Sequence, residues 1–420
     1  MGALAPPLFK LNLAFAMSDF ALVRQPVFGG TGSLIGYDIR FNDLDGAGSF
    51  AQSFLSGTFD LVRNRLPAFV STTREQFVAD AFLVAEPGSV VVMLPASLAP
   101  DDEVNEAIAR YIAAGGVLAL DEVGVTPVPA EAFLPHVSWV RIDSRSGDSA
   151  AINATCDRVT RSKGVPKLIA SHVEELDQYE ATLERGFDGF QGTFFSRPEP
   201  LPAADMPQST VAAMRLMGLA RDQRINDHQL EDVIATDPVL TFQLLRLVNS
   251  AALGGRGVAS IGQALRLIGR SAFLRWLAVA VAAARKSTNG VDQELVRQAV
   301  ERGRLCEQLV GSGRDAGTLF LVGLFSLLDA VFRMPLHEIL ERVVLSTEAT
   351  EALLDRTGPY ADAINFAESY ELGLFENASE IAKEMGVDPS KVGEFYTNAI
   401  TWTAEALGAV LESQGAESAR

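Results

Sequence analysis

The sequence predicts an α/β domain followed by an all-α domain, and three observations support this prediction. Before residue 196, apolar runs of strand length alternate with longer helix-forming segments, whereas after residue 210 helical periods replace them. Residues 196–210 contain four prolines, which deny a helix its backbone donors and favour extended chain. The length of 420 residues also suits two or three domains, at roughly 100 to 200 residues each.

The domain boundaries follow from these changes of pattern. We expect an N-terminal extension, an α/β domain, a proline-rich linker, a helical domain and a polar tail, with Met17 as an alternative start of the chain. The predicted segments are 1–17, 18–196, 197–210, 211–408 and 409–420.

The first half contains several runs of strand length with helices between them. Residues 103–114, which end at a glycine pair, and residues 149–163 have the composition of such helices. Alternating strands and helices indicate a mostly parallel sheet, in which functional residues gather at the carboxyl ends of strands. The strand runs are 20–28, 68–71, 89–94, 117–120, 139–142 and 167–170.

Helical periods run through the second half. Asp237-Pro238 is a strong helix start, because an N-cap residue is followed by proline at the first helical position. Residues 273–286 form one such helical period. The apolar runs 273–284 and 319–328 hold more apolar surface than a small bundle hides, so we expect part of it to be buried against the first domain or a partner. Further helical periods are 263–267, 293–311, 318–332, 337–345, 378–385 and 389–411.

Charge and composition argue against several functions. The 35 Lys+Arg and 53 Asp+Glu residues give a net charge of -18, which repels phosphate backbones and anionic lipid surfaces, so we expect no nucleic-acid partner. The longest apolar runs are shorter than the roughly 18 residues that span a bilayer. Cys156 and Cys306 lie far apart without metal-binding spacing, which fits a reducing cytoplasm. We therefore expect a cytoplasmic protein without a cofactor.

Four sequence motifs stand out in the first half. They read Gln25-Pro26-Val27-Phe28 with Gly36-Tyr37-Asp38, Leu118-Ala119-Leu120-Asp121-Glu122-Val123-Gly124, Val140-Arg141-Ile142-Asp143, and Gly186-Phe187-Asp188-Gly189-Phe190-Gln191-Gly192. In this order and spacing they resemble the motifs of EAL domains, the family of cyclic di-GMP phosphodiesterases. The resemblance implies a (β/α) barrel. Because the chain between Asp38 and Ser71 is short for the usual helix and strand, we expect a degenerate, shortened EAL-type barrel that is either reduced or partly open.

The second half carries three further motifs. They read Thr236-Asp237-Pro238-Val239-Leu240, Leu244-Leu245-Arg246-Leu247-Val248-Asn249-Ser250, and Ile261-Gly262-Gln263-Ala264-Leu265-Arg266-Leu267-Ile268-Gly269. They resemble the all-helical HDOD domain, a relative of HD phosphohydrolases, and the tandem EAL-HDOD arrangement is a known family of bacterial signalling proteins. The resemblance marks Asp237, Pro238, Asn249 and Ser250 as HDOD motif positions. Asn249-Ser250 also fits a helix C-cap and turn.

The EAL resemblance implies a two-metal site, and several of its ligand positions have changed. EAL enzymes are understood to cleave a phosphodiester with two divalent ions held by oxygen ligands. The glutamate of the EAL motif falls on Asp38, which is shorter by one methylene, and the next ligand, an asparagine, falls on Ser71. The third-strand glutamate falls on Met93, whose thioether does not bind Mg²⁺.

The remaining ligand positions keep more of the family's chemistry. The two aspartates of the LALDDFG strand fall on Asp121 and Glu122, and the strand lysine falls on Arg141, which has no deprotonated form. The glutamate of an AEGVE-like segment falls on Ser171, while the glutamine matches Gln191. Only Asp121 and Gln191 keep the family residue. We therefore expect no two-metal catalysis, no stoichiometric metal and no enzyme activity, that is, a catalytically inactive phosphodiesterase homologue.

The second domain lacks the metal-binding pair of HD hydrolases. Those enzymes need adjacent histidine and aspartate ligands, and none of the four histidines here is followed by aspartate. HDOD domains in general lack this pair, so the absence agrees with the resemblance.

Several positions have a structural interpretation beside the functional one. We favour an ion pair between Arg141 and Asp121 in place of a lost metal charge, and a core position for Met93. His172 fits a surface or packing residue better than a base. Asp121 and Glu122 fit a solvated strand end as well as a residual ligand pocket.

Three functions stay open. We favour a non-catalytic EAL-HDOD scaffold that mediates protein-protein interactions in or near cyclic di-GMP signalling, with its main protein-binding surface on the helical half. A receptor that binds cyclic di-GMP without hydrolysis is the alternative and would use Asp121, Gln191 and arginines near the phosphates. An active phosphodiesterase is the third. The expected partners are signalling proteins, and the barrel is expected to position the helical half or to supply a homodimer contact.

Overall fold

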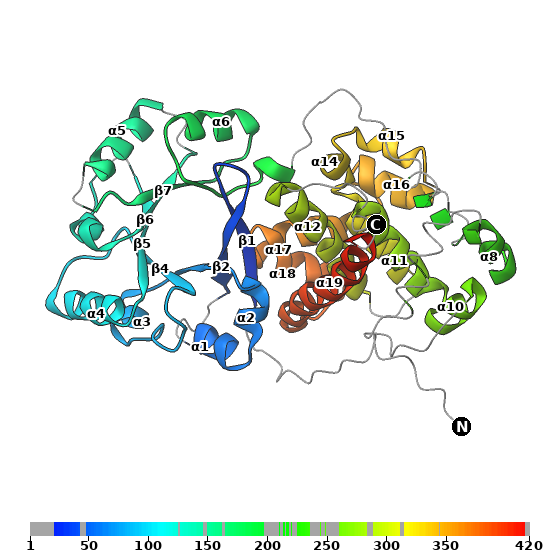
Figure 1. Ribbon diagram of the computed structural model, residues 1–420, viewed down its shortest axis with the longest axis horizontal. Helices are drawn as coiled ribbons and strands as arrows, with labels where there is room; N and C mark the ends of the chain where they lie inside the picture. The colour runs from blue at the N-terminus through cyan, green and yellow to red at the C-terminus, as the bar shows by residue number, and fades with distance from the viewer. Residues whose placement is uncertain are drawn as a thin grey trace.

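A computed structural model describes most of the chain (Figure 1). The described residues are 21–42, 48–124, 127–145, 149–161, 164–196, 225–235, 260–283, 289–310, 315–343 and 345–415, with Thr210 and separate helical residues between 213 and 248. The predicted extension 1–17, residues 197–209 of the predicted linker, and the HDOD motif positions Asp237, Pro238, Asn249 and Ser250 lie outside them.

Eight strands form a closed barrel in the order β1 to β8. Strand β1 (Leu22–Gly29) runs antiparallel to β2 (Leu34–Phe41) and to β8 (Gly189–Phe190), while the other neighbouring strands are parallel. The remaining strands are β3 (Ala68–Ser71), β4 (Val90–Pro95), β5 (Val117–Val123), β6 (Trp139–Asp143) and β7 (Lys167–Ser171). The sequence runs located six of the eight strands but did not mark β2 or the two-residue β8.

The expectation of a partly open barrel is wrong. Pairing of β1 with β8, Phe28 opposite Phe190 and Gly29 opposite Gly189, closes the sheet. The short connection between β2 and β3 does not prevent closure, because it holds two short helices, α1 (Gly48–Leu55) and α2 (Thr58–Arg63).

Helices surround the barrel and bury their apolar faces against its strands. In α4 (Asp102–Ala113), Val104, Ala107, Ile108 and Tyr111 are buried at helical spacing. The Asp101 side chain accepts from the amide of Val104 and caps this helix, which confirms the helix expected at 103–114. The other connecting elements are α3 (Arg74–Val78), the 3-10 helix η2 (Pro129–His136), α5 (Ser149–Thr160), α6 (Leu176–Glu184) and the 3-10 helix η3 (Phe194–Ser196).

The inside of the barrel is an apolar plug. Because side chains alternate along a strand, one residue in two points inward. The plug consists of Val27, Phe69, Val91, Met93, Ala119 and Ile169. Met93 is 1% exposed, which confirms its predicted core position.

A helical domain follows the barrel (Figure 1). Its described helices are α8 (Asp227–Ala235), α10 (Ile261–Ile268), α11 (Arg270–Ala282), α12 (Gly290–Gln308), α13 (Ala316–Phe325), α14 (Leu328–Phe332), α15 (Leu336–Leu340), α16 (Thr347–Leu354), α17 (Ala361–Glu371), α18 (Phe375–Glu384), the 3-10 helix η5 (Pro389–Lys391) and α19 (Val392–Gly415). The fold class expected from the sequence, an α/β barrel followed by an all-helical domain, is confirmed.

The apolar segments of this domain are buried among its own helices. Helices α11 and α13 contact one another, and both contact α12. Helix α13 approaches α12 closely because Gly323 faces the α12 backbone, where an added Cβ would lie 2.7 Å from the carbonyl oxygen of Arg302. Helix α14, which begins at Leu328, also contacts η3 at the end of the barrel domain, so the second apolar segment reaches the first domain at this end. Burial of this surface against a partner stays a prediction.

The two domains are docked through β1, β2 and the helices α12, α17 and α19, which lie side by side in Figure 1. Arg24 of β1 donates from Nη2 to Oε1 of Glu301 in α12 at 2.5 Å, and both side chains are buried. The Tyr37 hydroxyl of β2 donates to Oε2 of Glu294 at 2.9 Å. Distant parts of the chain thus meet in a partly polar interface.

Two tyrosines of the helical domain complete the hydrogen bonding of β1. The Tyr370 hydroxyl donates to the carbonyl oxygen of Leu22 at 2.9 Å, and the amide of Arg24 donates to the Tyr396 hydroxyl at 3.4 Å. Strand β8 pairs with β1 at Phe28 and Gly29. Along the rest of β1, helices of the second domain cover the strand edge that β8 leaves open.

Among the described residues, no helix combines the length and apolar character needed to cross a membrane.

Candidate functional site

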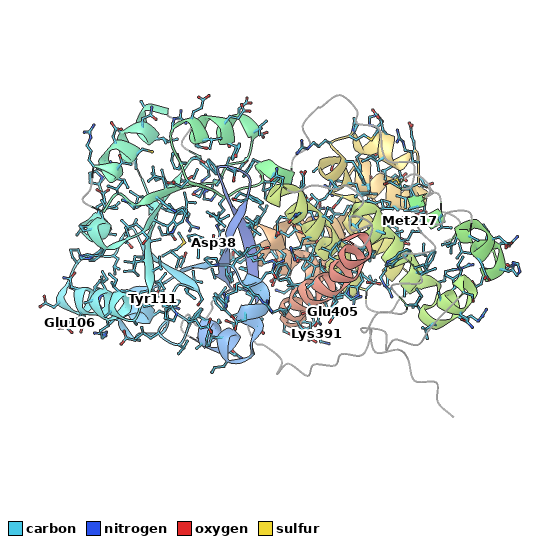
Figure 2. The ribbon with its side chains drawn as sticks, in the orientation of Figure 1. Asp38, Glu106, Tyr111, Met217, Lys391 and Glu405 are labelled. Carbon is cyan, nitrogen blue, oxygen red and sulfur yellow. The ribbon has the colours of Figure 1, made fainter. Side chains whose placement is uncertain are left out.

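Five polar side chains meet at one mouth of the barrel. Asp38 lies on β2 and is labelled in Figure 2, Ser71 ends β3, Asp121 lies on β5, Arg141 lies on β6, and Gln191 directly follows β8. Parallel strands present their carboxyl ends at the same edge, which places these positions together. We call these five residues the mouth cluster. They are five of the eight pocket positions predicted from the sequence.

Arg141 is the centre of the mouth cluster. Its Nη1 donates to Oδ2 of Asp38 at 2.8 Å and to Oε1 of Gln191 at 3.1 Å. Its Nε and Nη2 lie 2.7 and 2.6 Å from Oδ1 of Asp121. Burial opposes the charge of Arg141, but Asp38 and Asp121 outweigh burial and raise its pKa, so the guanidinium stays charged. The predicted ion pair with Asp121 is confirmed, and it extends to Asp38.

Asp38 is a buried carboxylate held through one of its two oxygens. Its Oδ2 accepts from Arg141, from Gln191 Nε2 at 2.6 Å and from Arg40 Nε at 3.1 Å. Burial alone would raise the pKa of Asp38, but the two arginines and the Gln191 hydrogen bond hold it below its ordinary value. The other oxygen, Oδ1, has no hydrogen-bond partner in the described part of the chain. The cluster therefore contains one buried acceptor that is still unsatisfied.

Further contacts fix the edges of the cluster. The Ser71 hydroxyl donates to Oδ2 of Asp121 at 2.9 Å, so the serine at the family's asparagine position contacts a carboxylate. Gln191 Nε2 also donates to Oε1 of Gln25 on β1 at 2.9 Å. Each side chain is thus held by a neighbour on a different strand, as a rigid site requires.

The other three predicted positions are placed differently. Met93 belongs to the apolar plug, and the Ser171 hydroxyl donates to the carbonyl oxygen of Ile142 at 3.3 Å. Glu122 is exposed, and its backbone is left-handed, with φ 47°. Neither Met93 nor Ser171 brings a carboxylate to the mouth.

His172 has a strained backbone conformation next to the mouth. Its φ is 57°, a region that favours glycine, and it stands where the AEGVE-like segment has glycine. The imidazole Nδ1 lies 3.3 Å from Oδ1 of Asp143 and 3.2 Å from Oγ of Ser171. Burial lowers the pKa of His172, although Asp143 acts in the opposite direction. The imidazole is half-buried at the barrel rim, a placement between the two alternatives that the sequence left open, a surface residue and a packing residue.

The mouth cluster does not fit the two-metal site that the EAL family implies. Two divalent ions need several oxygen ligands that converge on open space. Here the Arg141 guanidinium lies between the carboxylates of Asp38 and Asp121, and it carries positive charge at that position. Within the described ranges, no group of three or more His, Cys, Asp or Glu side chains is arranged to hold a metal ion.

Sequence reasoning missed two residues of the site. Gln25 was part of a quoted motif, but its side chain was not assigned a contact with Gln191. Arg40 lies two residues after Asp38 on the same strand face, and this spacing was the available signal.

A barrel with a polar mouth followed by an HDOD domain defines the class of protein. The family model described as "HDOD domain" matches residues 206–354. Together with the closed barrel before it, this match agrees with the resemblance to the tandem EAL-HDOD arrangement.

Two curated relatives align with most of this chain. "Cyclic di-GMP phosphodiesterase CdgJ" from Vibrio cholerae serotype O1 is 25% identical over 421 residues, covering 95% of this chain and 96% of the relative. "Uncharacterized protein YuxH" from Bacillus subtilis (strain 168) is 22% identical over 403 residues, covering 91% and 97%. Among solved structures, "PaMucR Phosphodiesterase, c-di-GMP complex" is 21% identical and covers 46% of this chain and 97% of that chain, with a TM-score of 0.34.

The expectation that the chain is not an enzyme is contradicted by these comparisons. A relative that aligns over 95% of the chain is named as a phosphodiesterase. The changed ligand positions, on which the expectation depended, are therefore not a sufficient ground for assigning inactivity.

Proposed function

We propose that this protein acts in cyclic di-GMP signalling, with the nucleotide recognised at the barrel mouth and signalling proteins contacting the helical domain. The observation that carries the proposal is the buried, arginine-centred mouth cluster in a chain that is similar over nearly its whole length to cyclic di-GMP phosphodiesterase CdgJ.

The chemistry of the mouth supports recognition of a phosphodiester. Arg40, Arg141 and Arg145 lie on or directly after β2 and β6, at the same edge of the barrel. Guanidinium groups bind phosphate oxygens through paired N–H donors. The Arg40 side chain is about one third exposed, so it is accessible to a ligand, whereas Arg141 is buried. The net charge of the whole chain does not set the potential at this edge.

The docked interface supports a protein-binding role for the helical domain. Because Arg24 and Tyr37 of the barrel bind Glu301 and Glu294 of α12, the barrel holds this domain in a defined position. The exposed leucines Leu372 and Leu374 lie between α17 and α18, close to this junction. A scaffold needs such a fixed presentation of surface side chains to its partner.

Calorimetric titration of the full-length protein with cyclic di-GMP tests the nucleotide half of the proposal. We expect saturable binding with about one nucleotide per chain, weakened at least about tenfold by Arg40→Met. Arg74→Met is the matched control, because Arg74 forms exposed ion pairs with Asp101 and Glu103 away from the mouth cluster. The same samples, incubated with Mg²⁺ or Mn²⁺ and analysed by chromatography, measure hydrolysis. Absence of binding at millimolar nucleotide would contradict the nucleotide half.

Affinity capture from the native cell tests the protein half. We expect the same partners with the unchanged chain and with Asp121→Ala or Gln191→Ala, since these side chains lie at the mouth and not on the helical domain. Loss of all partners with both variants, in proteins that remain folded, would make the mouth the protein-binding centre instead.

A further inference from the structure

We propose that Gln25 is a positioning residue that couples the mouth cluster to helix α17 of the helical domain. This inference rests on the proposed function, because it explains how a nucleotide at the mouth could alter the helical surface. Gln25 lies on β1 and contacts both domains through the two ends of one side-chain amide.

On the barrel side, Gln25 is directly opposite Asp38 in the β1–β2 register, so both side chains lie on the inner face. Its Oε1 accepts from Gln191 Nε2 at 2.9 Å, and the same nitrogen donates to Asp38 Oδ2 at 2.6 Å. The side-chain oxygen Oε1 of Gln191 in turn accepts from Arg141 Nη1 at 3.1 Å. Gln25 therefore helps to set the direction of the Gln191 amide, on which the mouth cluster depends.

On the helical side, Gln25 Nε2 donates to the backbone carbonyl of Glu371 at 3.1 Å. Glu371 is the last residue of α17, where carbonyl groups lack partners within the helix. Its carboxylate is held by α12, with Arg302 at 2.9 and 2.6 Å and Gln298 Nε2 at 2.6 Å. The amide of Gln25 thus ends on a carbonyl that two helices hold in place.

Only an amide side chain of this length can make both contacts. Glutamine offers one carbonyl acceptor and two N–H donors, whereas a glutamate at position 25 keeps the acceptor and loses the donor. Methionine keeps the length and loses both. A shift of α17 against β1 therefore changes the Gln25–Glu371 hydrogen bond first. The Gln25 amide then turns, and the hydrogen bond between Gln191 and Asp38 changes with it.

The unsatisfied oxygen of Asp38 shows where a ligand would act on this chain of bonds. Asp38 is 1% exposed, and its Oδ1 has no partner among the described residues. A ligand that donates a hydrogen bond to Oδ1 would pull the Asp38 carboxylate toward itself. The hydrogen bond between Asp38 and Gln191 would then lengthen or change direction. The movement reaches α17 through Gln25.

Tyr37→Phe provides a matched control. Tyr37 is adjacent to Asp38 on β2, and its hydroxyl also donates across the domain interface, to Glu294 of α12 at 2.9 Å. Successive side chains on a strand point to opposite faces, so Tyr37 is not connected to the mouth cluster. The variant removes one interdomain hydrogen bond and leaves the proposed connection intact.

Hydrogen exchange of the amides of Leu372, Gly373 and Leu374, which follow Glu371, measures the coupling in the full chain without a ligand. We expect Gln191→Leu to speed their exchange about fivefold, the effect of losing roughly one hydrogen bond. In a Gln25→Met background, Gln191→Leu should then have no further effect. In a Tyr37→Phe background it should keep its full effect. Equal effects of Gln191→Leu in all three backgrounds would overturn the proposal.

Addition of cyclic di-GMP separates this inference from the proposed function. We expect the nucleotide to change exchange at the same three amides in the unchanged chain and in Tyr37→Phe, but not in Gln25→Glu, which keeps the Gln191 contact and loses the α17 contact. If the nucleotide does not bind the unchanged chain, the proposed function fails, while the ligand-free comparison still decides the role of Gln25. If it binds and Gln25→Glu responds like the unchanged chain, the coupling through Gln25 is refuted.

Discussion

Replacement of Arg24 by methionine should destabilise the whole protein, because it breaks a buried ion pair that connects the two domains. Arg24 and Glu301 are 5% and 7% exposed, and their charged atoms lie 2.5 Å apart. Arg24 also donates from Nη1 to the carbonyl oxygen of Val62 at 2.7 Å and lies over the Tyr37 ring at 4.5 Å. Methionine keeps much of the side-chain length but removes the charge and the donors.

The magnitude follows from what remains after the substitution. Removing one partner of a buried ion pair costs about 3 to 5 kcal/mol, because the other group stays buried without its counter-ion. The Val62 carbonyl loses its donor as well, so we expect the free energy of unfolding to fall by about 4 kcal/mol. Adding Glu301→Gln removes the unpaired charge and should recover about half of this loss.

Urea denaturation at pH 8 measures the effect, with circular dichroism and tryptophan fluorescence as the two signals. Trp139 reports on the barrel, and Trp276 and Trp402 report on the helical domain. Arg74→Met is the control, since its ion pairs are exposed and its midpoint should not change measurably. A loss below about 1 kcal/mol for Arg24→Met, or a double variant less stable than either single one, would refute the reasoning.

Three further outcomes are expected. Burial raises the pKa of Glu301 from 4.5 to about 7, with Arg24 acting in the opposite direction, so the folded chain holds a proton that the unfolded chain releases. The free energy of unfolding should therefore fall as the pH rises from about 4.5 to about 7, and urea titrations of Glu301→Gln should show a flatter pH dependence. Arg141→Met should lower the free energy of unfolding by about 3 kcal/mol or more, and with it the urea midpoint, because Asp38 stays buried with Arg40 as its remaining ion-pair partner. An unchanged midpoint would contradict the central role of Arg141. Burial raises the pKa of Cys306 to about 12, so iodoacetamide at pH 8 should label it only after denaturation.

The sequence predicted the parts of the site that local patterns encode. Strand ends and motif spacing placed Asp121, Arg141 and Gln191 together, and charge complementarity predicted the ion pair between the first two. Asp38 was assigned to the site, but its contact with Arg141 depends on closure of the barrel between β1 and β8, and the short β2–β3 connection led us to expect a barrel that is not fully closed.

The docking of the domains could not be read from the sequence. Arg24 and Glu301 are 277 positions apart, and Gln25 and Glu371 are 346 apart, so no local period relates them. The apolar runs 273–284 and 319–328 drew attention as interface candidates, although helices α11 and α13 contact other helices. Pairs of buried polar side chains determine how the two domains dock. The sequence position of one buried charged residue does not tell which distant residue is its partner.

The covered edge of β1 also bears on how this chain could be divided. The part of β1 that does not pair with β8 forms backbone hydrogen bonds with Tyr370 and Tyr396. Both tyrosines lie far beyond the barrel in the sequence. A barrel expressed alone would present free strand backbone to solvent, which invites pairing between molecules and aggregation. The two halves therefore cannot be shuffled as interchangeable modules, and a gene that acquired only the barrel would also need a new cap for its first strand.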